Sequence, residues 1–313
     1  MKHNLILFII CLGLPLLASA QGIDIKLENR FSFAAMPENS YGFQGDYVNI
    51  RINGSINENL TYSFHHRLKN SFSASNPFGA TDWVYLLYRR GNWGIQAGKM
   101  QLEYGGYEYD EAPINVYYSS KFYDNMAGCF QFGLSLIYYL GESNKFTIQV
   151  TPSPLPADRW GGNMAYNFCA KGTAGFYGWK HSVNLFDIPG GGHLGCISLG
   201  NCFTAGPAKL ELDLVQRGGM KTFKMFDDCA VIANLVVAPT DWMNVIAKAS
   251  YDCNLSQYDP LVPEFGEYWS YGGGFEFFPK KGDKDIRIHT MYYYFNQPTL
   301  LMGLTWKIHL LTR

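Results

Sequence analysis

The sequence predicts an all-β protein, a transmembrane antiparallel β-barrel of about 16 strands. A long third extracellular loop is expected to fold into its lumen. Three observations predict this fold. Apolar and polar residues alternate in segments of roughly ten residues. Aromatic residues make up 16% of the 313 residues and charged residues only 16%, against about 25% in soluble domains. The chain also opens with the pattern of an export signal.

Residues 1–20 carry that signal. Lys2 and His3 form a short polar start, residues 5–17 are apolar apart from a glycine and a proline, and 18–20 read Ala-Ser-Ala. This order is typical of a secretory signal peptide with a small-residue cleavage site. A short buried helix is the alternative. We therefore expect a signal peptide at 1–20 and one barrel domain at 21–313.

Sixteen segments with period-two alternation follow the signal. In residues 127–140, for example, Phe132, Leu134 and Leu136 form an apolar file, and Gly133 and Ser135 oppose it. Alternation of this kind places one file on each face of a strand. The expected strands are 23–34, 45–56, 60–69, 81–90, 93–100, 127–140, 145–151, 163–171, 174–186, 193–204, 207–217, 228–238, 242–252, 267–278, 285–295 and 299–311.

The connections alternate as well. Even strands lead into tight turns such as 57–59, 91–92, 141–144, 171–173 and 280–283. Most odd strands lead into longer loops, above all 70–80, 101–126 and 253–266. Short turns on one rim and long loops on the other are typical of an outer-membrane barrel.

A barrel of this size is expected to enclose water. An unpaired strand edge in hydrocarbon costs several kcal/mol per group, so the sheet must close. Sixteen strands enclose more space than side chains can fill, which leaves an aqueous lumen and explains the polar files. A large soluble β domain is the alternative. Aromatic residues near the strand ends suit two interfacial girdles: Trp83, Trp93, Tyr138, Trp179, Trp242, Trp269 and Trp306.

Charge and cysteine content exclude several functions. The formal net charge of −1 argues against a nucleic-acid partner. Six cysteines follow the signal segment, without a CxxC pair or a histidine at metal spacing. They are interpreted as small apolar residues of strands, with a disulfide framework as the alternative. No metal or other cofactor is expected.

Residues 101–127 are the most informative stretch outside the strands. They hold glycines, a proline and many tyrosines, together with Glu103, Glu108, Asp110 and Glu111. The stretch is too long for a turn and too aromatic for a disordered tip. We expect an ordered loop that narrows the lumen; a loop packed over the outer mouth is the alternative.

The run from Ala97 to Gly106 reads AGKMQLEYGG, closes a strand and opens this loop. It resembles the corresponding region of the phosphate-selective porin O/P-like family, which comprises sixteen-stranded trimeric porins of Gram-negative outer membranes. The resemblance implies passive diffusion through a pore narrowed by the third loop. Two features depart from the family: the loop carries four acids where phosphate selectivity would need arginines and lysines, and the chain ends at Arg313 without a terminal Phe. We therefore expect this chain to share the pore of the family but not its phosphate selectivity.

Strand parity predicts the charges of the lumen. Twelve basic residues oppose the apolar files: Lys26, Arg30, Arg51, Arg67, Lys69, Arg89, Lys145, Lys180, Lys209, Lys248, Arg287 and Lys307. Five acids share these positions: Asp24, Glu28, Glu211, Asp213 and Glu276. We expect the four loop acids to face Arg51, Arg67, Lys99 and Lys26 at the constriction. A basic wall opposite an acidic loop predicts a weakly anion-preferring or barely selective pore. Snorkelling at the rims is the alternative reading for each charge.

Two other functions remain open at this point. Ser63 and His65 share a lumenal file and His289 and His309 lie on adjacent strands, so a hydrolase has its ingredients, but no nucleophile motif is present. A non-conducting structural or secretion-accessory barrel is the stronger rival. The expected setting is the bacterial outer membrane. The expected partners are the lipid bilayer, small hydrophilic solutes or anions, and two further copies in a homotrimer.

Overall fold

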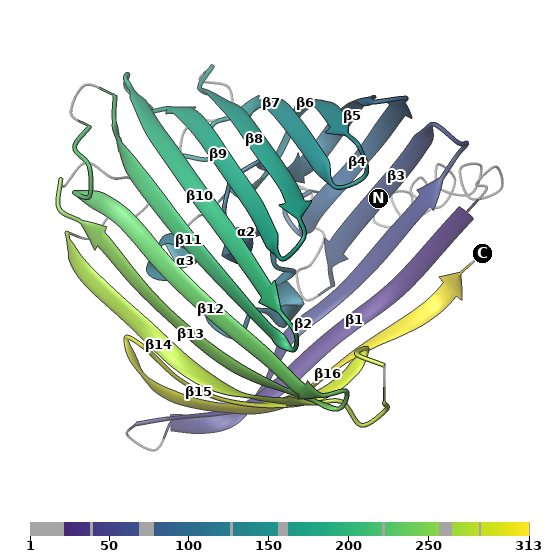
Figure 1. Ribbon diagram of the computed structural model, residues 1–313, viewed down its shortest axis with the longest axis vertical. Helices are drawn as coiled ribbons and strands as arrows, with labels where there is room; N and C mark the ends of the chain where they lie inside the picture. The colour runs from purple at the N-terminus through teal and green to yellow at the C-terminus, as the bar shows by residue number, and fades with distance from the viewer. Residues whose placement is uncertain are drawn as a thin grey trace, which may run out of the picture.

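The computed structural model describes residues 22–37, 40–68, 78–125, 128–155, 162–220, 223–256, 265–281 and 283–312. Over these ranges sixteen antiparallel strands form one closed barrel, as predicted (Figure 1). The strands are β1 (Gly22–Met36), β2 (Ser40–Ser55), β3 (Leu60–Arg67), β4 (Thr81–Arg90), β5 (Trp93–Gln101), β6 (Phe130–Leu140), β7 (Asn144–Pro152), β8 (Met164–Ala174), β9 (Tyr177–Asp187), β10 (His193–Ala205), β11 (Ala208–Gly219), β12 (Asp228–Thr240), β13 (Met243–Asn254), β14 (Gly266–Phe277), β15 (Ile286–Phe295) and β16 (Gln297–Thr312).

Every strand pairs with its neighbours in sequence, and the barrel closes where β1 pairs with β16. That seam runs from Asp24 opposite Thr312 to Ala35 opposite Leu300. Closure matters because the sheet then presents no free edge to the membrane interior, where an unpaired backbone group has no water to bond.

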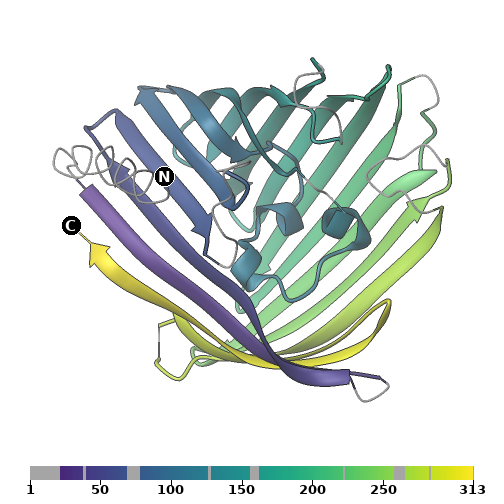
Figure 2. The same ribbon diagram turned by 180° about the vertical axis from the view of Figure 1, so that it is seen from behind.

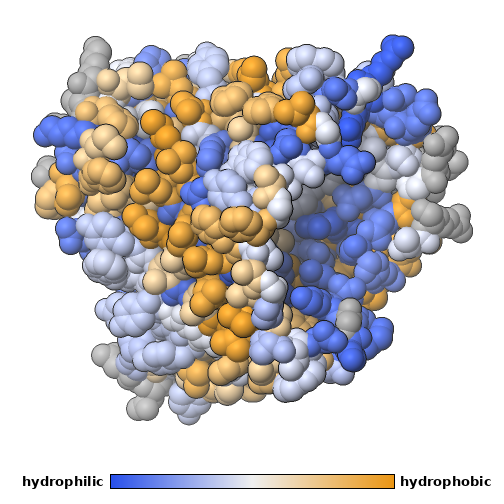
Figure 3. Space-filling view, viewed as in Figure 1, coloured by the Kyte–Doolittle hydropathy of each residue, from blue (hydrophilic) through white to orange (hydrophobic). Residues whose placement is uncertain are grey.

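The alternation of the sequence becomes an apolar outside and a polar inside. On β6, Leu134 is 55% exposed while Ser135 beside it is 1% exposed, and β7 and β9 repeat the pattern with Ile148 beside Thr147 and Val183 beside Ser182. Hydrophobic side chains gather over the outer wall, and hydrophilic ones line the hollow of the barrel (Figure 3). An outer wall of this kind is favourable in contact with lipid and unfavourable in contact with water.

Two details of the predicted strands are wrong. Residues 171–173 were expected to form a turn, but β8 continues to Ala174 and the chain reverses at Gly175, whose φ of 58° suits glycine. Trp83 was assigned to an interfacial girdle, yet its ring stacks on His65 with the centroids 4.3 Å apart and lines a cavity inside the barrel. The predicted signal peptide and Lys69 lie outside the described residues.

Residues 102–129, here called the inner loop, connect β5 to β6 and carry three short helical turns: α2 (Tyr107–Asp110), η1 (Pro113–Asn115) and α3 (Lys121–Asn125). Residues 126 and 127 of this loop are not described. Figure 2 shows α2 and α3 within the ring of strands, and the contacts below join the loop to opposite walls. Among the described residues, no helix is long and apolar enough to cross a membrane.

Candidate functional site

The inner loop first crosses the inner face of β7 and β9, where polar side chains hold its backbone. The amide N of Glu103 donates to Oε1 of Gln149 at 2.8 Å, and Nδ2 of Asn184 donates to the carbonyl of Glu103 at 3.0 Å. The amide N of Gly105 donates to Oγ of Ser182 at 2.7 Å. These bonds satisfy backbone groups that leave the β5 ladder, so the loop turns inward without losing hydrogen bonds.

Asp213 of β11 then receives the start of α2. Its carboxylate accepts the backbone N–H groups of Tyr107 and Glu108 at 2.8–2.9 Å. Gly106, just before them, has a φ of 95°, and a Cβ there would lie 2.5 Å from the hydroxyl of Tyr123 and 3.0 Å from Oδ2 of Asp213. Glycine is therefore required for this close approach.

Three further groups hold the middle and the far end of the loop. Arg30 of β1 and Arg287 of β15 both donate to the carbonyl of Ile114 at 2.9 Å. Lys248 of β13 lies 2.5 Å from Oε1 of Glu108 and donates to the carbonyl of Tyr118 at 2.7 Å. The loop is thus tied to walls on both sides of the lumen.

The last attachment is Asp252 of β13, whose carboxylate accepts the N–H groups of Lys121 and Phe122 at 3.2 and 3.1 Å. Tyr118 donates its hydroxyl to the carbonyl of Lys248 at 2.7 Å. Burial raises the pKa of this tyrosine above its ordinary value, so its hydroxyl remains a donor at neutral pH.

Apolar packing supports these polar attachments. A buried cluster joins the loop residues Leu102, Tyr104, Tyr109 and Phe122 to inward-facing residues of the wall, namely Ala165, Phe186, Leu194, Cys196, Val215 and Ala230. The wall residues occupy positions that the alternation assigns to the wet face of β8 to β12. Sequence reasoning did not use this signal: apolar residues on a lumenal file mark the patch against which a loop packs.

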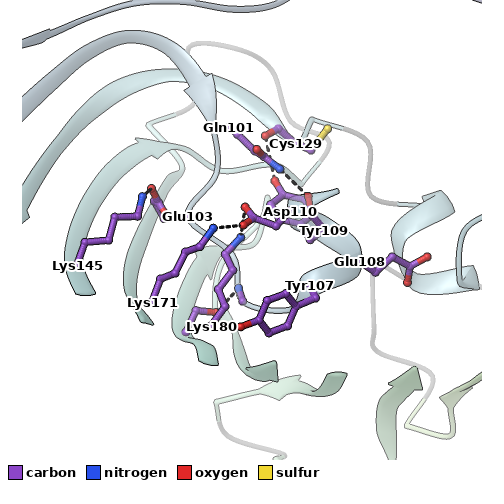
Figure 4. A network of polar contacts seen from close by, with 12 residues as sticks. Gln101, Glu103, Tyr107, Glu108, Tyr109, Asp110, Cys129, Lys145, Lys171 and Lys180 are labelled. Carbon is purple, nitrogen blue, oxygen red and sulfur yellow. Dashed lines mark hydrogen bonds and ion pairs between the residues drawn. The ribbon is translucent and has the colours of Figure 1, made fainter. Parts of the chain in front are cut away.

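The four predicted loop acids lie inside the barrel, and three of them meet lysines. Glu103 lies 3.4 Å from Lys145, and Asp110 forms ion pairs with Lys171 and Lys180, the latter at 2.8 Å (Figure 4). Burial alone would raise the pKa of Asp110, but the two lysines lower it below its ordinary 3.8. Glu108 pairs with Lys248, as described, and Glu111 accepts a hydrogen bond from the Asn115 amide.

Of the four predicted basic partners, two line a cavity together with loop acids and two lie elsewhere. Arg51 and Arg67 line a cavity with the loop acids, where Arg51 sits over the Trp83 ring, 5.2 Å from its centroid, and Arg67 pairs with Asp82 at 2.9 Å. Lys26 pairs with Asp24 at 3.2 Å, near the start of β1.

Lys99 does not face the lumen. It is opposed by Val84 and Phe132 on the outward file of the wall, and it donates to the carbonyls of Phe78 and Thr81. Neighbouring residues of a strand face opposite sides of the sheet, and Gly98 and Met100 on either side of Lys99 take the inward positions. The Lys99 side chain therefore faces outward. The expected pairing of this lysine with the loop acids is wrong.

Among the described residues, four cavities are lined in part by the inner loop, and one of them, of about 380 Å³, lies between Lys121 and β13 to β15. The largest, of about 610 Å³, lies between the loop and β1 to β4, and Arg30, Arg51 and Arg67 line it opposite Glu108, Asp110, Glu111 and Asp124. A second, of about 210 Å³, is lined by Lys145, Lys171 and Lys180. The two share Trp83, Gln101 and Asp110, so they adjoin at the loop. A third, of about 180 Å³, lies between the loop and the wall from β11 to β15.

The histidines weighed for catalysis are engaged otherwise. Ser63 donates its hydroxyl to Oδ1 of Asn53 at 2.6 Å, and Nδ1 of His65 lies 2.9 Å from Asp82. His309 contacts Asp285 at 3.1 Å, and the His289 ring lies 4.7 Å from that of Tyr117. Neither pair therefore places a nucleophile beside a base.

A closed sixteen-stranded barrel with an apolar outside, a polar inside and a long loop folded into its lumen has the architecture of the porin-type barrels of the bacterial outer membrane. A family model described as phosphate-selective porin O and P matches residues 30–174, from β1 to the end of β8. This match confirms the resemblance found in the sequence.

Solved structures share the fold at low sequence identity. The outer membrane channel DcaP of Acinetobacter baumannii superposes with a TM-score of 0.68 at 10% identity, covering 93% of this chain and 98% of that chain. The anion-selective porin from Comamonas acidovorans gives 0.67 at 8% identity, with 91% and 99% covered. OmpT, an outer membrane protein of Vibrio cholerae in a trimer form, gives 0.65 at 10% identity, with the same coverage. No curated protein matches the sequence.

Proposed function

We propose that this protein is a passive diffusion porin with a weak preference for anions. The observation that carries the proposal is the cavity of about 610 Å³ beside the inner loop, which is lined by charged and tyrosine side chains. A loop that packs on one part of the wall and leaves a wetted space along another narrows a pore without closing it. Solutes then cross down their concentration gradient, and no catalytic step is involved.

The preference for anions rests on how the charges are matched. Three loop acids, Glu103, Glu108 and Asp110, are held by lysines within 3.4 Å, so their fields are largely cancelled. On the opposite wall, the described residues offer Arg51 an aromatic ring and no ion pair. Its guanidinium therefore adds positive potential on this wall of the cavity, facing Glu111 and Asp124 on the loop, and supports a weak rather than a strong preference for anions.

Assembly as a homotrimer in the outer membrane is part of this proposal, since a barrel of the same fold is described in a trimer form. A heat-labile trimer band in detergent, converted to a monomer band on boiling, tests it. Transport without catalysis is also proposed, and it is supported by the engagement of Ser63 and His65 with other partners.

The test is single-channel current of the purified protein in a planar bilayer with a salt gradient across it. Stable ohmic steps and a reversal potential of the anion sign are expected, and Arg51→Gln should shift that potential towards cations. Lys281→Gln is the matched control, because Lys281 is an exposed lysine outside the lumen, in the turn after β14. An inserted barrel without steps would support the non-conducting alternative; a cation-preferring potential would overturn the selectivity alone.

A further inference from the structure

Two cysteines face each other across β12 and β13. Cys229 is opposed by Cys253 in the ladder, and their Sγ atoms are 3.3 Å apart. Both side chains are buried. The backbone oxygens of Phe226 and Asp227, in the loop before β12, each lie 3.5 Å from Sγ of Cys253.

This geometry suits a covalent bond. Directly opposed residues of an antiparallel ladder have Cα atoms about 4.5–5.5 Å apart. That separation falls within the range of about 4.4–6.8 Å spanned by disulfides. The two sulfur atoms need only small side-chain rotations to close from their present contact to a bond of about 2.05 Å.

The other four cysteines lack this arrangement. In the described strands, Cys169 is opposed by Thr147 and Ser182, Cys196 by Asn184 and Arg217, and Cys202 by Gly178 and Glu211. Cys129 precedes β6. The register therefore singles out one pair, which the sequence spacing did not reveal because 24 residues separate its members.

We propose that Cys229 and Cys253 form a disulfide in the membrane-inserted protein. Cys229 is the second residue of β12 and Cys253 the second last of β13, so the pair lies at the end of the barrel where the long loops lie. Both sides of the outer membrane are oxidising, and disulfides persist there.

The oxidant is a protein disulfide of a thiol–disulfide oxidoreductase. The thiolate of one cysteine attacks that disulfide and forms a mixed disulfide, and the oxidoreductase keeps one sulfur as a thiol. The second cysteine then attacks the mixed disulfide, which leaves the bond between Cys229 and Cys253. Two protein thiols are oxidised and one oxidoreductase disulfide is reduced to a dithiol, so the exchange balances.

The bond would fasten the wall behind the inner loop. Asp252, next to Cys253, accepts the N–H groups that begin α3. The carbonyl of Cys253 accepts a hydrogen bond from Nη2 of Arg217 at 2.9 Å, and the Arg217 guanidinium lies 4.7 Å from the Phe122 ring centre. A covalent link at this point therefore holds β13 in register where it carries the loop.

The test counts free thiols by intact mass. Protein from outer membranes is quenched in acid, denatured and labelled with N-ethylmaleimide, with and without prior reduction. Of the six cysteines that follow the predicted signal segment, four are expected to be labelled without reduction and six after it. Peptide mapping should recover Cys229 linked to Cys253. Six labels without reduction, or a bond between another pair, would overturn the proposal.

Two serine variants separate this pair from the rest. Cys253→Ser leaves five cysteines, and all five are expected to react without reduction, because Cys229 has lost its partner. Cys169→Ser is the matched control, a buried strand cysteine outside the pair. Its five cysteines should give three labels without reduction and five after it. Equal labelling of the two variants without reduction would contradict the assignment. Folding is verified independently by the shift in gel mobility on boiling.

Discussion

Removing the amine of Lys248 should loosen the inner loop. This group lies 2.5 Å from Glu108 and donates to the carbonyl of Tyr118, and the two charged side chains are 10% and 5% exposed. Breaking such a pair from one side costs about 3–5 kcal/mol, because a carboxylate remains buried without its partner. We take the lower figure, about 3 kcal/mol, because the lumen is wet. At about 1.4 kcal/mol per tenfold, the equilibrium for loop detachment shifts roughly a hundredfold.

The assay is the open-channel current of Lys248→Met in a planar bilayer. Excursions to a higher conductance are expected, since a detached loop widens the constriction, and they should occur about a hundred times more often than in the wild type. The double variant Glu108→Gln with Lys248→Met should return towards the wild-type trace, because it leaves no unpaired buried charge and keeps an acceptor for the N–H of Ser120.

Lys307→Met is the control, since Lys307 also faces the lumen yet makes no hydrogen bond or ion pair to the inner loop among the described residues. It should change selectivity without adding excursions. The reasoning is refuted if Lys248→Met and Lys307→Met give the same trace, or if the double variant is noisier than Lys248→Met alone.

Two further predictions concern the inner loop, and a third concerns the outer wall. Asp110→Asn removes the carboxylate between Lys171 and Lys180, so the reversal potential should move towards anions. The pKa of Asp110 is lowered below its ordinary 3.8, so this group is ionised at both pH 7 and pH 5 and loses its charge only below 3.8. The shift in reversal potential should therefore be equal at pH 7 and pH 5. Gly106→Ala should destabilise the attached conformation of the inner loop by about 1–3 kcal/mol and add noise to the channel current. Gly190→Ala is the control, also at positive φ but in open space, and should leave the current without added noise. Leu134→Arg on the lipid face should lower the free energy of unfolding in urea by about 2–4 kcal/mol, if that residue lies near the midplane, and an unchanged value would contradict the outward assignment of Leu134.

The strands could be predicted from the sequence because the membrane imposes a simple rule. Alternate residues of each strand must face the lipid and the aqueous lumen in turn. Position along the strand alone therefore assigned residues such as Arg51 and Lys248 to the lumen. Lys99 was expected to face the loop acids although parity did not assign it to the lumen, and its opposed residues Val84 and Phe132 show that it lies on the outward file close to the strand end. A rim lysine can reach backbone carbonyls there, so polarity no longer reports the face.

The partners of the loop acids could not be predicted, because they depend on where the loop crosses the lumen. That path is fixed by groups with no local pattern. Asp213 accepts backbone N–H groups more than a hundred residues away in sequence, and Asp252 does the same for α3. The apolar lumenal residues Phe186 and Val215 were the one local signal of the crossing, and they point to the packed side of the barrel rather than to individual ion pairs.

The seam between β1 and β16 has a consequence for biogenesis. These two strands lie at opposite ends of the described chain, yet twelve residue pairs of their ladder complete the barrel. Until β16 arrives, β1 and every partial sheet expose an edge that another chain can extend. A ribosome delivers the chain gradually, so the nascent protein must be kept apart from its copies until its last strand is available. Closure of the barrel therefore waits for the last strand of the chain, and the edges that stay open until then are the parts of a folding intermediate most prone to pair with other chains.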